Sequence, residues 1–491
     1  MDILTEIKTK IPADLAKVKR YMENRVGLGV SFDLGVREIT LRDVPIQIYY
    51  VNGLCDTAYI IEIMETLVAI NEFEGIEHPN SDMYALVKNR LVQQSVDVKQ
   101  TMDEMVDQVL SGLIAIIVDD SQKALIIDVR SYPGRTPQEP DTERITRGAR
   151  DGYVENIIVN TALTRRRIRD ERLRFEIMRV GERSKTDIAI GYIEGIANPH
   201  LVEIVKNELE CIKVDGLTMA EKTVEEFLVK QNYNPYPLVR YTERADVGAN
   251  HLLEGHVLIF VDTSPSIMIA PTTFFHHVQH AEEYRQSASV GTIIRWFRFL
   301  GIFSSLFLIP LWLLFVLEPH LLPKSLEFIG PSDNNHVHIL VQIAFAEVGI
   351  ELLRIASIHT PAPLSSAMGL IAAVLIGQIA IDVGWLVPEV LFYISIATIG
   401  SFATPSLELG LANKYVRYVL LLMTGAFHVP GLIIGSTLFV LFLSHLNTLS
   451  TPYLWPFIPF SPKALWRIII RRPVPVSHFR PRILHPIDRK K

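Results

Sequence analysis

Two glutamates and one arginine stand inside an apolar stretch of the second half of the chain. Glu347, Glu351 and Arg354 lie among the Ile, Leu, Val and Ala residues of segment 339–358. Residues three or four apart share a helix face, so these charges point the same way. A carboxylate inside a bilayer costs roughly 2.5–3.5 kcal/mol and normally faces protein or water. Two interpretations stay open: the glutamates line a polar interior, or Glu351 pairs with Arg354 on a helix at the membrane interface.

Small residues recur every four positions in the next apolar segment, 364–381. Gly369, Ala373 and Gly377 have the spacing that lets helices approach closely. The polar residues beside or after this stripe are Gln378, Asp382 and Glu389. The pattern is typical of helix packing within one subunit, or of a narrow pore made from one such helix per subunit, with an apolar gate and a charged mouth. The candidate site residues are therefore intramembrane polar groups and packing residues.

Patterns that indicate catalysis or metal binding are absent. The sequence contains no G-x-x-x-x-G-K-[ST], G-x-G-x-x-G, H-E-x-x-H or C-x-x-C motif, and no nucleophile has a recognisable base. We therefore expect no enzyme, no cofactor and no metal site. His276, His277 and His280 have a spacing that resembles metal ligands, but no set of thiolates or carboxylates completes them. A solvated linker helix at the membrane surface is the expected structure for this segment.

A basic run precedes these histidines in the sequence. Its members are Arg165, Arg166, Arg167, Arg169, Arg172 and Arg174. The surrounding region is acidic and has no interleaved aromatic residues, so we expect no nucleic-acid partner. A solvated face, a subunit interface with paired acidic residues, or contact with lipid headgroups is the expected role.

The charges divide the chain into two unlike parts. The 491 residues carry a net charge of -6, but residues 291–491 hold 15 basic and 9 acidic side chains, which leaves 33 and 45 for residues 1–290. Because 49% of the residues are apolar, wholesale disorder is excluded. Cys55 and Cys211 are too few for a disulfide scaffold. The uncharged stretches of the second part indicate a membrane protein.

Several segments are apolar enough to cross a bilayer. Residues 299–317, FLGIFSSLFLIPLWLLFVL, carry no charge and can span a hydrocarbon core of roughly 30 Å at about 1.5 Å per residue. Segments 364–381 and 390–403 are also apolar. Segment 418–446 is interrupted by Pro430-Gly431, and it predicts either one kinked span or a hairpin of two shorter helices. The expected number of spans is four to six.

The flanking charges predict the orientation. Arg295 and Arg298 precede the first span, acidic residues follow it, and the tail from Lys463 is strongly basic. By the positive-inside rule, the N-terminal region and the tail are cytoplasmic. Both ends on one side require an even number of crossings.

Helix and strand patterns alternate throughout the N-terminal region. They predict a two-lobed α/β or α+β cytoplasmic part, followed by an all-α polytopic membrane domain. The polar segment 131–150, which contains Pro and Gly, is the predicted connection between the lobes. The expected units are lobe 1 (1–135), lobe 2 (136–283), a membrane-entry linker helix (284–298), a transmembrane helical domain (299–450) and a basic cytoplasmic tail (451–491).

Five ordered stretches carry a resemblance to a known family. They are YYVNGLCDT (49–57), EPDTERITRGARDGYVENIIVNTALTRRRIRD (139–170), DTSPSIMIAPTTFFHHVQHAEEY (262–284), IRWFRFLGIFSSLFLIPLW (294–312) and PYLWPFIPF (452–460). Together they resemble the A-subunit type of the spore germination GerA family over nearly the whole chain after about residue 30. SFDLGVREITL (31–41) and YYVNGLCDT favour a paralogous branch over the nutrient-receptor A subunits.

The resemblance implies a multi-pass protein of the spore inner membrane that acts in germination. It implies a homo-oligomeric, pentameric cation channel in contact with membrane lipid. It also implies other germination membrane proteins as partners, either B- and C-type subunits or, for the paralogous branch, a small membrane partner with which it amplifies ion release. The alternative is a non-conducting scaffold or signal-relay subunit of a germinant receptor complex. A secondary transporter, indicated only by the Pro430-Gly431 break, ranks last.

Overall fold

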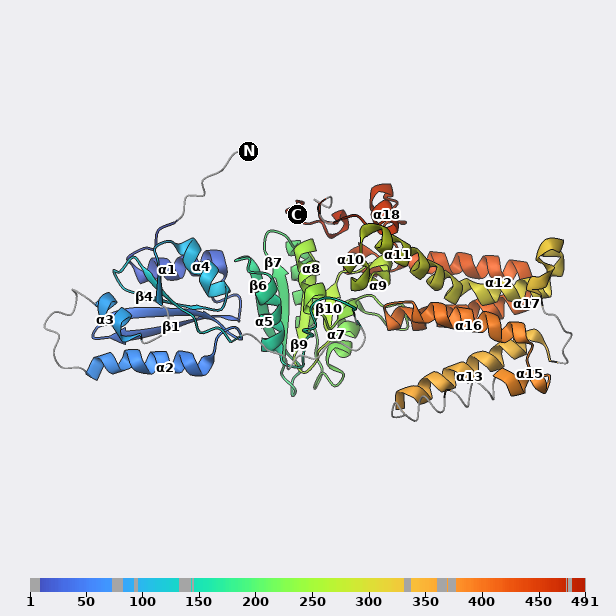
Figure 1. Ribbon diagram of the computed structural model, residues 1–491, viewed down its shortest axis with the longest axis horizontal. Helices are drawn as coiled ribbons and strands as arrows, with labels where there is room; N and C mark the ends of the chain where they lie inside the picture. The colour runs from blue at the N-terminus through green and yellow to red at the C-terminus, as the bar shows by residue number, and fades with distance from the viewer. Residues whose placement is uncertain are drawn as a thin grey trace.

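The molecule consists of two mixed lobes followed by a helical region. The computed structural model describes residues 9–72, 83–91, 96–131, 143, 145–330, 337–359, 369, 377–473, 475 and 479–490. Figure 1 shows an elongated arrangement in which the lobes and the helical region follow one another, and the C-terminus lies beside the second lobe. The predicted succession of a mixed α and β part and a helical part is confirmed.

The first lobe is a sheet covered by helices on both faces. Its elements are α1 (Leu15–Tyr21), η1 (Met22–Val26), β1 (Leu34–Leu41), β2 (Val44–Val51), α2 (Thr57–Val68), η2 (Ala69–Glu72), α3 (Met83–Arg90), β3 (Val96–Lys99), α4 (Met102–Leu110), β4 (Ile114–Val118) and β5 (Ala124–Ile127). Neighbouring strands are antiparallel, in the order β1-β2-β4-β5-β3. Side chains alternate across a strand, so Ile46 and Ile48 pack under α2 and α3, whereas Tyr49 and Val51 pack under α1 and α4.

The second lobe repeats the first in element order and strand order. Its elements are α5 (Ile157–Arg167), β6 (Leu173–Val180), β7 (Thr186–Ile193), α6 (Pro199–Glu210), α7 (Ala220–Val229), β8 (Arg240–Thr242), α8 (Ala245–Glu254), β9 (Val257–Val261) and β10 (Ile267–Ala270). The order β6-β7-β9-β10-β8 corresponds strand by strand to that of lobe 1, and it is also antiparallel. Of the two predicted classes, the antiparallel sheets make each lobe α+β. The sequence shows no such repeat because the two copies share strand positions rather than side chains.

A buried ion pair joins the two lobes. The guanidinium of Arg165 on α5 donates to both carboxylate oxygens of Asp33, at 2.8 and 3.1 Å, and both side chains are almost fully buried. Ser31 accepts from Arg165 and from the backbone of Phe175, while Phe32 donates its N–H to the Phe175 carbonyl. The segment before β1 is therefore fastened to the edge of the lobe 2 sheet.

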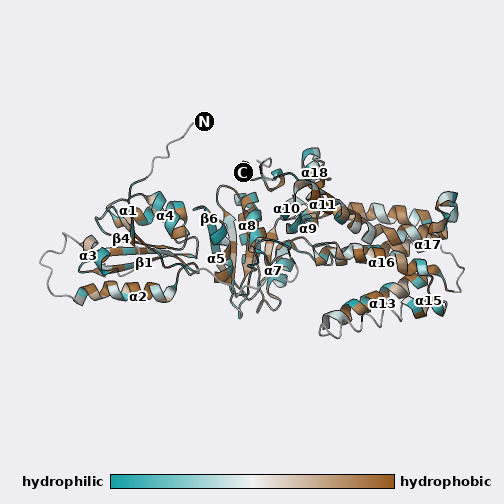
Figure 2. Ribbon diagram, in the orientation of Figure 1, coloured by the Kyte–Doolittle hydropathy of each residue, from teal (hydrophilic) through white to brown (hydrophobic). Residues whose placement is uncertain are grey.

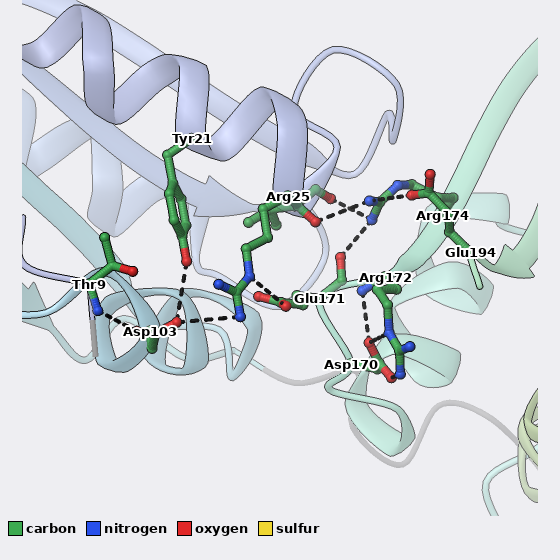
Figure 3. A network of polar contacts seen from close by, with 10 residues as sticks. Thr9, Tyr21, Arg25, Asp103, Asp170, Glu171, Arg172, Arg174 and Glu194 are labelled. Carbon is green, nitrogen blue, oxygen red and sulfur yellow. Dashed lines mark hydrogen bonds and ion pairs between the residues drawn. The ribbon is translucent and has the colours of Figure 1, made fainter. Parts of the chain in front are cut away.

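A more exposed polar network surrounds this pair. Figure 3 shows Arg25 between Asp103 of lobe 1 and Glu171 of lobe 2, and Arg174 directed at backbone carbonyls near Arg25. Arg174 also pairs with Glu194 at 2.7 Å. The basic run thus meets acidic residues at an interface, as one of the interpretations supposed, but the interface lies between two lobes of one chain.

Among its described residues, the helical region contains two runs that are long and apolar enough to cross a membrane, Ala288–Leu317 and Leu407–His445, and a shorter apolar helix, Pro388–Phe402. Its elements are α11 (Ala288–Phe303), η3 (Ser304–Leu308), α12 (Ile309–Leu317), η4 (Pro319–Leu321), η5 (Lys324–Ile329), α13 (Ile339–His359), α15 (Ala380–Asp382), α16 (Pro388–Phe402) and α17 (Leu407–His445). Figure 2 shows that hydrophobic residues concentrate on these helices, whereas the lobes are mixed. Most of the exposed large hydrophobic side chains of the described residues accordingly lie after residue 283.

Helix α17 is a hairpin rather than one continuous span. His428 has φ 54° and ψ -131°, two residues before Pro430, which has no N–H to continue the helix. A Cβ on Gly435 would lie 2.8 Å from the Leu420 side chain, and a Cβ on Gly431 would lie 2.0 Å from the Met423 carbonyl oxygen. Residues 420 and 435 would be about 22 Å apart in a straight helix. Of the two alternatives, the hairpin of shorter helices is therefore correct.

The junction between lobe 2 and the helices is built from distant parts of the chain. Its elements are α9 (Phe274–Val278), α10 (Ala281–Arg285), β11 (Asn447–Thr448), β12 (Thr451–Pro452), α18 (Pro462–Ile469) and η8 (Arg482–Leu484). Tyr236 of lobe 2 packs with Ile302, Leu409, Leu443 and Tyr453 in one apolar cluster. Tyr236 also donates its hydroxyl to Asn413 at 2.9 Å. The linker helix expected at His276, His277 and His280 is wrong, because α9 and α10 are separate short helices whose side chains complete this junction.

Replacing Asp33 with Ala tests the interlobe pair. The substitution leaves the buried Arg165 charge without its carboxylate, so the free energy of unfolding should fall by about 3–5 kcal/mol. The measurement is urea denaturation of the purified protein followed by far-UV circular dichroism. Asp187→Ala is the matched control, since its partner Arg179 is 73% exposed, and it should cost less than about 1 kcal/mol. Equal losses for both variants would contradict a buried interlobe pair.

Candidate functional site

The charged residues of α13 face two cations of α17. Glu347 is 3% exposed, and its carboxylate lies 2.7 Å from a guanidinium nitrogen of Arg417. The hydroxyl of Tyr418 donates to the same carboxylate at 3.3 Å. A buried charge is tolerated only when an opposite charge and hydrogen bonds replace its water. Glu347 is therefore compensated inside the subunit.

Arg417 reaches from this carboxylate to a third helix. Its second terminal nitrogen donates to the carbonyl of Ser305 at 2.8 Å. Ser305 lies in the π-helical turn η3, and Pro310, five residues later, has no N–H to donate back into that turn. The proline thus explains why a backbone carbonyl is available for a side chain at this depth. Arg417 joins α13, α17 and the α11–η3–α12 run.

Glu351 occupies the next turn of α13 and forms a second, more exposed cluster. Its carboxylate contacts both Arg354 of the same helix and Lys414 of α17. Lys414 lies 4.0 Å from Glu347 as well. Each of the two interpretations of this segment describes part of what is observed. Glu351 pairs with Arg354 within the helix, and Glu347 is enclosed by protein.

Lys414 and Arg417 complete this cluster, and they are not among the residues predicted from the sequence. The predicted apolar segment begins at residue 418, directly after them, whereas α17 begins at Leu407. A signal was available in the sequence. Lys414, Arg417 and Tyr418 lie three and four residues apart at the start of an apolar run, so they share one helix face. The glutamates of α13 likewise interrupt an apolar run. Pairing them required the antiparallel packing of two helices, which the sequence does not show.

The other predicted residues lie apart from this cluster. Gln378 and Asp382 are exposed, and Glu389 is half-buried in the first turn of α16, where a negative charge suits the helix dipole. Gly369 and Gly377 have open space where a Cβ would stand, and Ala373 lies outside the described residues. Close helix contacts occur elsewhere, since a Cβ on Gly400 would lie 2.3 Å from the Gly301 carbonyl oxygen.

Polar contacts also join the helices at the end of the bundle that lies farthest from lobe 2. Gln342 is buried at the start of α13, donates to the Val337 carbonyl and accepts from the N–H of Val387, each at 2.8 Å. The imidazole of His428, at the turn of the α17 hairpin, lies 2.7 Å from the carboxylate of Glu318. Polar side chains therefore connect the helix ends where backbone groups lose their helical partners.

A buried carboxylate fastens the helices to lobe 2. Glu283 on α10 is fully buried between Arg295, at 2.7 Å, and Arg298, both on α11. The guanidinium of Arg471, from the tail, donates to the carbonyls of Tyr284 and Gln286 at 2.8 and 2.7 Å. The arginines expected only to orient the first span therefore also hold the junction together.

The histidine segment is buried instead of solvated. His276 and His277 are 9% and 2% exposed, and the rings of His251 and His256 pack against each other and against His276. His276 and His280 do not share a helix, because α9 ends at Val278. Burial lowers the pKa of His277 to about 3 and, with the neighbouring His256 and His251, holds the pKa of His276 well below its ordinary value. Among the described residues, no group of three His, Cys, Asp or Glu is placed to hold a metal ion.

The chain is similar to known proteins over most of its length. The family model described as Bacillus/Clostridium GerA spore germination protein matches residues 20–483. The chain is 60% identical over 484 residues to stage V sporulation protein AF of Bacillus subtilis (strain 168), covering 99% of this chain and 98% of that protein. It is 30% identical over 391 residues to the uncharacterized membrane protein YfkQ of the same organism, covering 79% and 76%. The crystal structure of the N-terminal domain of the A subunit of the Bacillus megaterium spore germinant receptor GerK3 is similar at 26% identity and a TM-score of 0.43, covering 55% of this chain and 99% of that chain.

Replacing Arg417 with Met tests the cluster between the helices. Glu347 would remain buried without its nearest cation, so the free energy of unfolding in detergent should fall by about 3–5 kcal/mol. The double variant E347L/R417M removes both charges and should regain most of that loss. Arg354→Met is the control and should cost about 1 kcal/mol, because Glu351 keeps Lys414. A double variant no more stable than R417M would contradict a direct pair.

Acid should destabilise the junction through its buried imidazoles. The unfolded chain protonates His277 below its ordinary pKa of 6.5, whereas the folded chain keeps it neutral down to a pKa of about 3. Stability is therefore lost as the pH falls through this window, by about 1.4 kcal/mol per pH unit for this one residue. For His277→Phe, the decrease in the free energy of unfolding per unit decrease in pH should be smaller by this amount. An unchanged slope, measured by urea denaturation between pH 7 and pH 4, would contradict the burial of a neutral imidazole.

Proposed function

The chain belongs to the GerA family of spore germination proteins, and we propose that it acts in germination as one subunit of an oligomeric cation channel of the spore inner membrane. The observation that carries the channel proposal is a division among the polar residues. The charged residues Glu347, Lys414 and Arg417 are paired inside the bundle. Gln378 and Asp382 are instead exposed, on a segment where Gly369 and Gly377 have open space in place of a Cβ. Residues of this kind can line a path between subunits.

The paired charges support a structural role for the bundle itself. A cation that passed beside Glu347 would compete with Arg417, which already lies 2.7 Å from that carboxylate. A permeation path needs binding weak enough for the ion to leave. The proposed pore is therefore lined by the segment around Gly369, Gly377, Gln378 and Asp382, one copy from each subunit, with Glu347 and Glu351 behind it.

The proposed topology places the lobes and the tail in the cytoplasm. Among the described residues, five helical segments run between the lobe side and the far end of the bundle: 288–317, 339–359, 388–402 and the two arms of α17. Helix α13 ends on the lobe side and α16 begins at the far end, so the proposal includes a sixth passage between them. Six crossings suit a tail that contacts lobe 2, since the Ile487 N–H donates to the Ile196 carbonyl.

A scaffold or signal-relay subunit is the second candidate. The observation that favours it is the junction, where Glu283, Arg295 and Arg471 tie lobe 2, the first helix and the tail together. Such a junction could pass a change in the lobes to the helices without any conduction. Under either candidate, homo-oligomers, other germination membrane proteins (B- and C-type subunits or a small membrane partner) and membrane lipid are the proposed partners.

Two substitutions in the exposed segment test the channel. In vesicles that contain the purified protein, Gly377→Phe should strongly reduce potassium efflux by narrowing the path. Asp382→Asn should lower efflux by about tenfold at low ionic strength and less at high salt, because a charge at a mouth concentrates counterions. Glu327→Gln, an exposed acid in the loop after the first span, is the matched control and should have no effect. Wild-type protein that conducts no ions would eliminate the channel and leave the scaffold.

A further inference from the structure

Helix α18 carries a tryptophan between two cations on its exposed side. Lys463, Trp466 and Arg467 are exposed, and they have the i, i+3 and i+4 spacing of one helix face, whereas Ile468 is buried against the protein. Trp466 is 54% exposed, which is unusual for a side chain of its size if it faces only water. The face joins an aromatic ring to positive charge.

The contacts of α18 fix its height along the first membrane helix. The carbonyls of Ile468 and Ile469 accept from Arg295 at 2.7 Å and from the indole N–H of Trp296 at 3.1 Å. Trp296 lies three residues before the uncharged segment that begins at Phe299, a distance of about 5 Å along a helix. Figure 2 places α18 beside the start of the hydrophobic helices. Helix α18 therefore lies at the level where a lipid headgroup layer meets the hydrocarbon.

The neighbouring surface has the same character. Phe457 and Phe460, in the turn before α18, are 48% and 67% exposed, and Phe297 and Leu300 on α11 are 69% and 60% exposed. No Asp or Glu occurs between residues 409 and 487, so no acidic side chain of the tail offsets its basic residues before Asp488. Tryptophan at membrane interfaces and basic residues at anionic lipid surfaces are the chemistry that this combination fits.

We propose that the exposed face of α18, together with the turn at Phe457–Phe460, binds the anionic headgroup layer of the membrane on the side of the lobes. The inference rests on the proposed placement of the helices in a membrane. The aromatic rings insert at the headgroup level, and the ammonium of Lys463 and the guanidinium of Arg467 pair with lipid phosphates. Because α18 is bonded to Arg295, which also holds Glu283, the lipid surface becomes part of the junction with lobe 2.

The test is tryptophan quenching in vesicles that contain the full-length protein. Brominated acyl chains are placed either on phosphatidylglycerol or on phosphatidylcholine, at the same bromine content, and the signal of Trp466 is the difference between wild type and Trp466→Phe. Bromine on the anionic lipid should quench Trp466 more strongly. In K463Q/R467Q the preference should fall by about fivefold for each cation removed, since a basic side chain near an anionic surface is worth about 1 kcal/mol. R482Q/R489Q removes two exposed cations of the tail beyond α18 and should keep the preference.

The outcomes distinguish failure of the headgroup site from failure of the proposed membrane function. Equal quenching by both lipids, or a preference that survives in K463Q/R467Q, overturns the proposal. Absence of quenching by either lipid, with an altered oligomer mass for Trp466→Ala, means that a second copy covers the face and also overturns it. A wild-type protein that alkaline carbonate extracts from the vesicles contradicts the proposed membrane function itself. A protein that resists extraction but shows no lipid preference contradicts only the headgroup site.

Discussion

A charge that is removed from water must meet an opposite charge or hydrogen bonds, and each junction of this chain is arranged around one such pair. One pair joins the lobes, one joins lobe 2 to the first helix, and one joins the helices of the bundle. The pairs are Asp33–Arg165, Glu283–Arg295 and Glu347–Arg417. Each partner lies on a different element, so the pairs determine how preformed elements are placed. Apolar burial holds the elements together, but it is less selective about orientation.

Local patterns predicted much of this architecture. The succession of helix and strand patterns in the lobes, the first apolar segment and the break at Pro430 all follow from residues within one segment. The candidate site was predicted only in part. Glu347, Glu351 and Arg354 were identified because they interrupt an apolar run, and the structure places them in two adjoining clusters that Lys414 connects.

The missed features depend on residues far apart in sequence. Arg417 is 70 residues from Glu347, and its contact with Ser305 spans 112. Burial of the histidines of α9 required the tail to return and cover them, as Tyr453 does beside His277. The repeat of the lobes was hidden because a strand needs only apolar alternation, which many sequences satisfy.

The apolar cluster around Tyr236 can be completed only late in the synthesis of the chain. Its members come from lobe 2, from α11 and α17, and from Tyr453 after α17. At a synthesis rate of about 5–20 residues per second, residue 453 is added roughly 9 to 35 s after residue 278. Until then the strands of lobe 2 have been made, but Tyr453, which packs in the cluster with Tyr236, has not. The surface of lobe 2 is therefore completed only after α17 and the residues that follow it have been made, so the lobe and the helical region reach their final form together.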